Sequence, residues 1–248
     1  MFLDKKIKAI LCLRGGYGSA RLLPLLDFAL IRQHPKIFIG YSDITSLHCA
    51  FLKKANLISF HGPMLNVELA TGELPEFTVQ SLLKTVMEPA PAGGIRAGFK
   101  QKTISILRGG RARGELIGGN LSVLCTTLGT PYQPDFKRKI LFLEDVSEKP
   151  FRLDRMLTHL GNAGILRQLA GVAIGINLDC ADPHPNKLKE YRQTMADVLM
   201  ERLSPLKIPV VMGLPFGHQP WNATLPIGVR AELDGQKGDL IITEAAVR

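Results

Sequence analysis

The sequence predicts an α/β fold in two parts, a first part built from parallel βαβ units and a second part richer in strands. Strand-like and helix-like segments alternate over residues 1–88, as in a parallel sheet with crossover helices. The run Pro89-Ala90-Pro91-Ala92-Gly93-Gly94 then breaks this alternation. Apolar strands predominate in the rest of the chain. We therefore predict an N-terminal domain over 1–88, a linker over 89–101 and a C-terminal domain over 102–248.

The elements of the first part are predicted from apolar runs and their spacing. Residues 8–13 are mostly apolar and predict a buried strand, which a glycine-rich turn follows. Residues 43–55 predict a helix because apolar side chains recur every three or four residues. The other expected elements are a helix over 19–31 interrupted by Pro24, strands over 36–40 and 57–60, and a helix over 76–87.

The second part contains further apolar strands and ends in a predicted hairpin. The pattern alternates over 227–233, turns at Asp234-Gly235 and returns over 239–243. Strands are also expected over 140–143, 171–176 and 208–212, and helices over 152–160 and 188–203.

Composition excludes several classes of protein. The 248 residues are 46% hydrophobic and 21% charged, which fits a globular protein with a sizeable core and excludes disordered, collagen-like and disulfide-scaffold chains. The longest uncharged stretch, 116–134, is interrupted by glycines and proline, so it predicts no membrane-spanning helix. The N-terminus lacks the basic-then-apolar order of a signal peptide. We expect a cytoplasmic protein.

The charge and cysteine patterns favour neither nucleic acid nor metal as a partner. Net charge is +9, but the basic residues are scattered. The two small clusters, at 111–113 and 137–139, have no interleaved aromatic residues, so a solvated basic surface is favoured. The four cysteines are far apart and form no CxxC pair, which argues against a zinc ribbon or a thioredoxin-type motif.

Ser42 is the sharpest candidate for chemistry. It lies in Gly40-Tyr41-Ser42-Asp43, directly after a predicted strand and before a predicted helix. Such a turn lifts a nucleophilic hydroxyl off the sheet edge, and the helix start supplies N–H groups for an oxyanion. The alternative is an ordinary helix N-cap. The match to G-x-S-x-G is incomplete because Ile44 occupies the last glycine position.

Two other segments at predicted strand ends have a functional and a structural interpretation each. Residues 15–18, Gly-Gly-Tyr-Gly, predict either an anion-binding loop or a tight turn, and they match no phosphate-binding motif. Glu144 and Asp145, with Glu148 nearby, predict either carboxylates at the ligand edge of a sheet or a charged loop that caps the helix near Arg152.

The histidines differ in their context. His48 and His159 fall inside predicted helices and are expected to pack. His61 follows a strand. His184 lies among residues of ligand type, but the neighbouring prolines and the lack of a second histidine argue against a metal site. His218 follows a strand and a loop framed by glycines, a plausible place for a catalytic base.

The chain resembles the LD-carboxypeptidase family of serine peptidases, which includes murein tetrapeptide carboxypeptidases and the microcin C self-immunity peptidase. Six segments match in the family's order and together cover nearly the whole chain. They are R-G-G-Y-G at 14–18, G-Y-S-D-I-T at 40–45, H-G-P-M at 61–64, G-G-N-L at 118–121, L-E-D-V at 143–146 and G-L-P-F-G-H at 213–218.

The resemblance implies a Ser–His–Glu triad of Ser42, His218 and Glu144, with an oxyanion hole from the backbone N–H groups of Asp43 and Gly16. It implies a flavodoxin-like parallel domain that carries the serine and a second domain that carries the other two residues. It further implies a cytoplasmic homodimer that needs no cofactor or metal and releases D-alanine from murein tetrapeptides during peptidoglycan recycling.

Three alternatives stay open. They are microcin C-type amide hydrolysis, muropeptide binding without catalysis, and nucleotide binding at the glycine turn. Family members begin with a strand–helix region before the R-G-G-Y-G turn, whereas this sequence begins almost at that strand. We therefore expect a truncated N-terminal domain with an exposed strand at the edge of its sheet.

Overall fold

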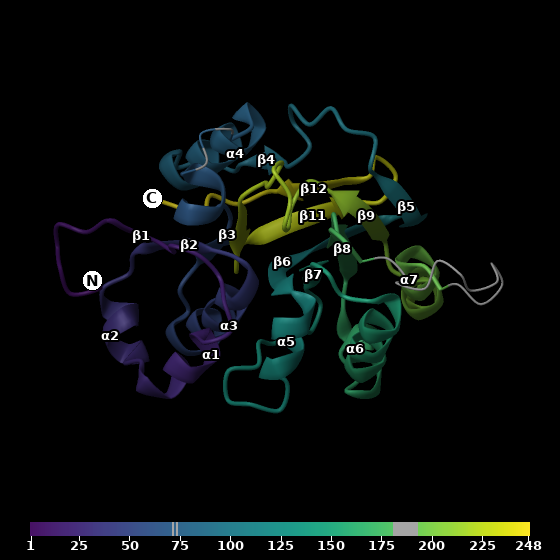
Figure 1. Ribbon diagram of the computed structural model, residues 1–248, viewed down its shortest axis with the longest axis horizontal. Helices are drawn as coiled ribbons and strands as arrows, with labels where there is room; N and C mark the ends of the chain where they lie inside the picture. Colours follow the sequence, from purple (N-terminus) through teal and green to yellow (C-terminus); the bar gives the residue numbers. More distant parts are fainter. Residues whose placement is uncertain (71, 73, 181–192) are drawn as a thin grey trace.

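The computed structural model describes residues 1–70, 72, 74–180 and 193–248, which form two sheets (Figure 1). The smaller sheet has the strand order β1-β2-β3-β10. Its first three strands are parallel, and β10 pairs antiparallel with β3. Their bounds are Ala9–Leu11 (β1), Ile37–Gly40 (β2), Ser59–His61 (β3) and Leu225–Ile227 (β10).

The larger sheet has the order β4-β12-β11-β6-β7-β8-β9-β5. Its centre, β6 to β9, is parallel, and antiparallel strands flank it on both sides. The bounds are Gly93–Gly94 (β4), Ser105–Arg108 (β5), Arg111–Asn120 (β6), Ile140–Glu144 (β7), Gly171–Gly175 (β8), Val210–Leu214 (β9), Arg230–Asp234 (β11) and Asp239–Ile242 (β12).

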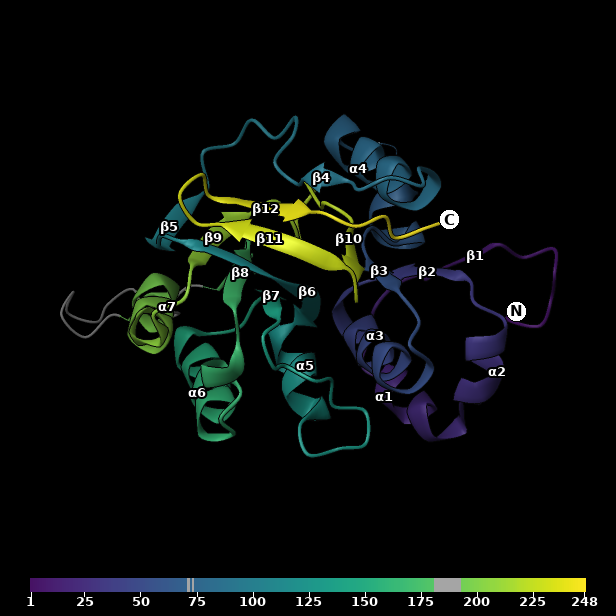
Figure 2. The same cartoon turned by 180° about the vertical axis from the view of Figure 1, so that it is seen from behind.

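The helices cover the two sheets mainly from one side. In Figures 1 and 2, α1–α3 lie below the smaller sheet, α5–α7 lie in a row below the larger one, and α4 lies above with β4. No helix in the described ranges has the length and apolar character needed to cross a membrane. The bounds are Ser19–Leu22 (α1), Phe28–Gln33 (α2), Thr45–Ala50 (α3), Glu76–Met87 (α4), Leu121–Thr127 (α5), Pro150–Asn162 (α6) and Met195–Leu203 (α7), with short turns η1 (Leu23–Leu25), η2 (Ser42–Ile44), η3 (Phe51–Ala55), η4 (Leu65–Leu69), η5 (Leu166–Gln168) and η7 (Ser204–Leu206).

The predicted α/β class is confirmed, and most elements differ from expectation only at their ends. The expected helix over 19–31 is divided into α1, η1 and α2, because Pro24 lacks the N–H that a continuous helix needs. The helix expected over 188–203 is observed from Met195, and residues 188–192 lie outside the described part of the chain.

The two predicted parts interlock more than a simple linker would allow. Residues 89–101 were expected to be a plain connector, but they contain β4, which pairs with β12 of the larger sheet. From the second part, β10 completes the smaller sheet. Along α4, the Thr78 hydroxyl donates to the carbonyl of Pro220 at 2.6 Å. The domain division itself stays a prediction. At the other edge of the smaller sheet, β1 pairs with β2 alone among the described residues.

Two glycines near the end of β6 allow close packing, one against the neighbouring strand β7 and one against helix α3. Gly118 and Gly119 have φ of +144° and +142°, a region that favours glycine. A Cβ on Gly118 would lie 1.8 Å from the carbonyl oxygen of Phe142, and one on Gly119 would lie 2.5 Å from Oγ1 of Thr45. The contact of Gly119 brings the start of α3 against the end of β6, next to the end of β7 where Glu144 lies.

Candidate active site

Ser42 occupies a strained turn between β2 and α3. Its φ is +63°, a left-handed conformation that is uncommon for a residue other than glycine. Its side chain caps neither η2 nor α3, so the N-cap interpretation is wrong. A half-buried serine in a strained strand-to-helix turn is typical of a nucleophile elbow.

The glycine turn after β1 is hydrogen-bonded to the turn that carries Ser42. The Asp43 carboxylate accepts hydrogen bonds from the backbone N–H groups of Gly18 and Ser19, both at 2.9 Å. Asp43 therefore already occupies the anion-binding position at the start of α1, which argues against a phosphate there. Apart from bonds within helices and strands, the backbone N–H groups of Gly16 and Asp43 donate no hydrogen bond among the described residues, so both are candidates for binding an oxyanion.

In the glycine turn after β1, Gly15 packs directly against Ser42. A Cβ on Gly15 would lie 3.1 Å from Cβ and 3.2 Å from Oγ of Ser42, which is tight packing. We expect Gly15→Ala to lower kcat/KM at least ~10-fold, because a misplaced reacting group loses orientation. Gly18→Ala is the matched control, since its Cβ would meet nothing within 4 Å. Steady-state kinetics should separate the two variants, and equal activities would contradict this packing argument.

Glu144 and His218, predicted from distant segments, lie in direct contact. The Nδ1 atom of His218 is 2.6 Å from Oε2 of Glu144. Glu144 is fully buried at the end of β7, and the side chain of His218 is 18% exposed in the loop after β9. The ring of Tyr41, the residue before Ser42, packs edge-on against His218 with centroids 4.8 Å apart. The structure thus brings the two candidate residues, His218 and Glu144, together and places them beside the serine turn.

The charges around His218 favour its protonated form. Burial alone would lower the pKa of His218, but the hydrogen bond and charge of Glu144, with the charges of Asp145 and Glu68, raise it above the ordinary 6.5. The carboxylates come from β7, from the residue after it, and from η4. A histidine tuned in this way is well suited to accept a proton during catalysis.

Sequence reasoning missed Tyr41 and Glu68 as parts of the site. The Tyr41 hydroxyl donates to Oε1 of Glu68 at 2.5 Å, and the backbone N–H of Met64 donates to Oε2 at 2.8 Å. Burial, followed by the charge of Glu68, raises the pKa of Tyr41, and burial raises the pKa of Glu68. The pair holds the ring that supports His218. No local pattern marks Glu68, because its role depends on long-range packing.

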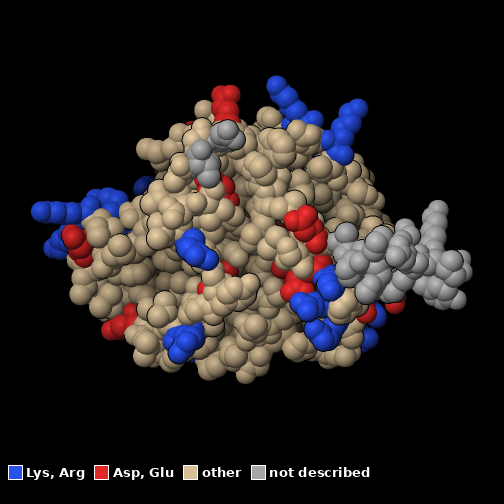
Figure 3. Space-filling model, viewed as in Figure 1, with Lys and Arg blue, Asp and Glu red and all other residues tan. Residues whose placement is uncertain are grey.

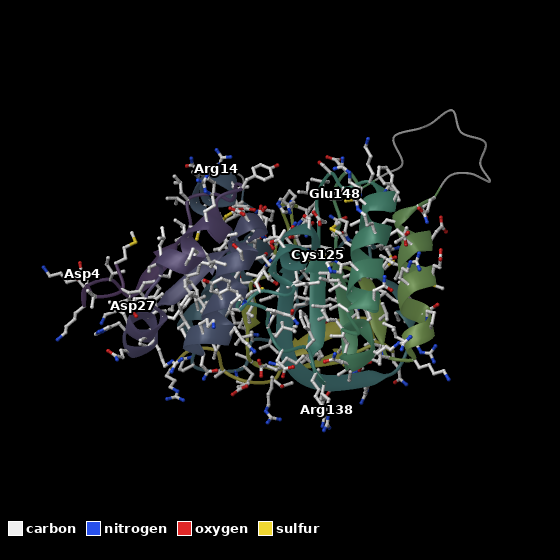
Figure 4. All side chains as sticks on the ribbon, turned by 90° about the horizontal axis from the view of Figure 1, so that it is seen from below. Asp4, Arg14, Asp27, Cys125, Arg138 and Glu148 are labelled. Atoms are coloured by element: carbon white, nitrogen blue, oxygen red, sulfur yellow. The ribbon has the colours of Figure 1, made fainter. Side chains whose placement is uncertain are left out.

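Asp145 and Glu148 serve mainly structural contacts. Asp145 accepts hydrogen bonds from the Asn120 side chain at 3.1 Å and from the Ser122 N–H at 2.9 Å, at the start of α5. Glu148 lies 3.6 Å from Arg152. The charged-loop alternative therefore fits only the Glu148–Arg152 ion pair, because Asp145 is buried and binds the start of α5, and no described side chain caps α6. Figure 4 shows Arg14, after β1, and Glu148, after β7, on the same side of the molecule, opposite Arg138. The carboxyl ends of β1 and β7, one strand from each sheet, therefore point to the same side.

The other histidines divide between the core and the surface. His48 is fully buried, as expected, with its ring nitrogens 2.8 Å from Oγ of Ser59 and from the carbonyl oxygen of Gly40. His159 was expected to pack, and this was wrong. It lies on the exposed face of α6, opposite the buried Leu153 and Leu157. His184 lies outside the described residues.

The described residues contain no group of three or more potential ligands that could hold a metal ion, and their four cysteines are free thiols. Figure 3 shows Lys and Arg on one face in separate groups, interspersed with acidic residues, as the scattered sequence pattern predicts.

Comparisons with known proteins show the family of this chain. Residues 1–62 match the LD-carboxypeptidase N-terminal domain model, and residues 113–233 match the C-terminal domain model. A relative from Synechocystis sp. is 42% identical over 241 residues, which is 96% of this chain and 74% of the relative. The murein tetrapeptide carboxypeptidase of Pseudomonas aeruginosa is 34% identical over 238 residues, 93% of this chain and 74% of that protein.

Solved structures give the same result. The microcin C7 self-immunity protein MccF superposes with a TM-score of 0.86 at 27% identity, covering 100% of this chain and 79% of that one. Complexes of MccF with glutamyl sulfamoyl guanosine and with aspartyl sulfamoyl adenosine are also similar to this chain. On the sequence matches above, this chain belongs to the LD-carboxypeptidase family.

Proposed function

We propose that this protein is a serine-type LD-carboxypeptidase that releases the terminal D-alanine from murein tetrapeptides in the cytoplasm, during peptidoglycan recycling. The observation that carries the proposal is the strained Ser42 turn beside the buried Glu144–His218 pair. The family membership, and the name of the Pseudomonas relative, support the choice of substrate.

The proposed reaction uses the three side chains in separate roles. His218 takes the proton of the Ser42 hydroxyl as its oxygen attacks the carbonyl carbon of the scissile bond. Glu144 orients the imidazole and stabilises the imidazolium. The N–H groups of Asp43 and Gly16 bind the oxyanion, each worth about 3 kcal/mol of barrier lowering. His218 then protonates the leaving D-alanine amine, and water releases the acyl group.

Substrate binding would complete the arrangement. Among the described residues, Ser42 and His218 share no hydrogen bond, although Tyr41 lies against the imidazole. Hydrogen bonds between nucleophile and base commonly shorten only when substrate is bound.

The direct experiment is mass spectrometry of a murein tetrapeptide after incubation with the purified chain. We expect the tripeptide and free D-alanine as products. An intact tetrapeptide after prolonged incubation with folded protein would contradict the proposal. Calorimetry on the same sample would then reveal the alternative, binding without turnover.

The similarity to MccF favours a second candidate within the same family, hydrolysis of an aminoacyl sulfamoyl nucleoside. Parallel assays with aspartyl sulfamoyl adenosine and the tetrapeptide would rank the two by kcat/KM. The predicted homodimer is a separate proposal, which analytical ultracentrifugation would test.

The environment of His218 predicts opposite pH dependences for activity and stability. Only neutral His218 can act as base, so the acid limb of kcat/KM should lie above pH 6.5, because the pKa of His218 is raised. A raised pKa stabilises the folded state fully below the unfolded value, and this contribution disappears as pH rises through the folded pKa. Activity should therefore increase over the interval in which this stabilisation is lost. A pH series of kcat/KM and melting temperature tests this, with His218→Ala as the control for stability.

A further inference from the structure

A group of buried polar side chains without hydrogen-bond partners lies behind the proposed triad. It comprises Oε1 of Glu144, both ring nitrogens of His61, Nδ2 of Asn222 and Oγ1 of Thr224, none of which has a partner among the described residues. All four residues are at most 1% exposed. Because buried polar groups are nearly always hydrogen-bonded, these atoms require a partner that the described residues do not supply.

Asn222 reaches the carboxylate side of this group. Its Oδ1 accepts a hydrogen bond from the backbone N–H of Gly217 at 3.2 Å. Gly217 lies directly against Glu144, since a Cβ on it would be 3.0 Å from both Cβ and Oε2 of that residue. The amide group of Asn222 is thus bound to a residue that itself contacts Glu144.

His61 and Thr224 form the other side. His61 pairs with Leu225 across β3 and β10, and a Cβ on the adjacent Gly62 would be 2.9 Å from Oγ1 of Thr224. The ring of His61 packs edge-on against Phe142, with centroids 5.2 Å apart. Phe142 and Glu144 are two residues apart on β7 and share one face of it. His61 therefore packs against the face of β7 from which the Glu144 side chain also projects.

We propose that these four side chains hold a buried water molecule that donates a hydrogen bond to Oε1 of Glu144, which makes His61 and Asn222 positioning residues for the triad acid. The water accepts from the N–H groups of His61 and Asn222, and donates to Oε1 of Glu144 and Oγ1 of Thr224. This gives it four partners, within the range usual for buried water. Burial, with the charges of His48 and His218, lowers the pKa of His61 well below its usual value, so His61 is neutral and carries one N–H.

The role in catalysis rests on the proposed function of Glu144. When His218 is neutral, Glu144 is a buried carboxylate without a countercharge on its ring partner. This is the state that most needs a donor at Oε1. Loss of the donor would therefore disfavour that state and raise the pKa of His218 by about one pH unit.

The test is His61→Leu, which removes the N–H and keeps an apolar side chain in the core. We expect the acid limb of kcat/KM to move up by about one pH unit. The NMR titration of the His218 ring should move equally in the free protein. His61→Gln keeps an N–H donor, so the His218 titration of this variant should lie close to that of the wild type.

The matched control is His48→Leu, a second fully buried histidine whose ring nitrogens are both hydrogen-bonded elsewhere. It should lower the melting temperature without moving the His218 titration. Thr224→Val, which is nearly isosteric, should give a smaller shift in the same direction as His61→Leu.

An unchanged His218 titration in folded His61→Leu, or in Thr224→Val if the first variant does not fold, would overturn the inference. Because the titration needs no substrate, it remains informative if the wild-type chain releases no D-alanine. That second result would overturn the proposed function instead.

Discussion

Ser42→Ala should lower kcat for tetrapeptide hydrolysis by about 10⁴-fold or more, the effect seen when a triad nucleophile is removed. The substitution deletes only the hydroxyl, and the structure shows no hydrogen bond from that hydroxyl among the described residues. The melting temperature should therefore stay close to that of the wild type. Mass spectrometry and differential scanning fluorimetry on one preparation measure both. Undiminished hydrolysis would exclude a serine nucleophile at this position.

Ser42→Gly is the companion variant, because it separates chemistry from backbone strain. At φ of +63° a side chain is strained, and glycine relieves that strain. We expect the same loss of activity together with about 1 kcal/mol of added stability relative to Ser42→Ala. A less stable glycine variant would show that the turn is not strained as described.

Glu144→Gln should lower kcat by about 10⁴-fold, as replacement of a triad acid by its amide does elsewhere. The carboxylate Oε2 lies 2.6 Å from Nδ1 of His218. An amide of the same shape removes the charge that stabilises the imidazolium and can select the wrong tautomer of the ring. Full kcat in the folded variant would remove Glu144 from the triad.

Asp145→Asn is the matched control for Glu144→Gln. Asp145 is the adjacent acid, also buried, and it accepts hydrogen bonds from Asn120 and Ser122 instead of contacting His218. We expect Asp145→Asn to lower the melting temperature, while its kcat should fall much less than that of Glu144→Gln. A comparable loss of kcat in both variants would mean that the local fold, and not the Glu144 charge, accounts for the effect.

The sequence predicted those parts of the fold whose signals are local. Strands β7, β8 and β9 are apolar runs next to turn residues, and α4 was predicted with its observed bounds, Glu76–Met87. Strand β10 was missed because Pro226 sits in its middle. Strand β6 was missed altogether, because exposed charges, such as Arg111 and Arg113, interrupt the apolar pattern of its first half.

The three candidate residues of the site were predictable from the sequence, but the contacts that hold them in place were not. Ser42, Glu144 and His218 follow strands, and the family resemblance links them. The positive φ of Ser42, the Tyr41–Glu68 bond and the partnerless His61 depend on packing between distant segments. The misplacement of His159 has a simpler cause. It falls one position off the apolar stripe of α6 that includes Leu160.

The pairing of β3 with β10 also has a consequence for synthesis on the ribosome. The sheet that carries the serine turn is closed by residues 225–227, close to the end of the chain. Contacts between segments so far apart form late and slow the folding of a domain. The sheet beside the candidate site therefore stays incomplete until β10 has been synthesised, and a product that stops before this strand leaves one edge of β3 unpaired.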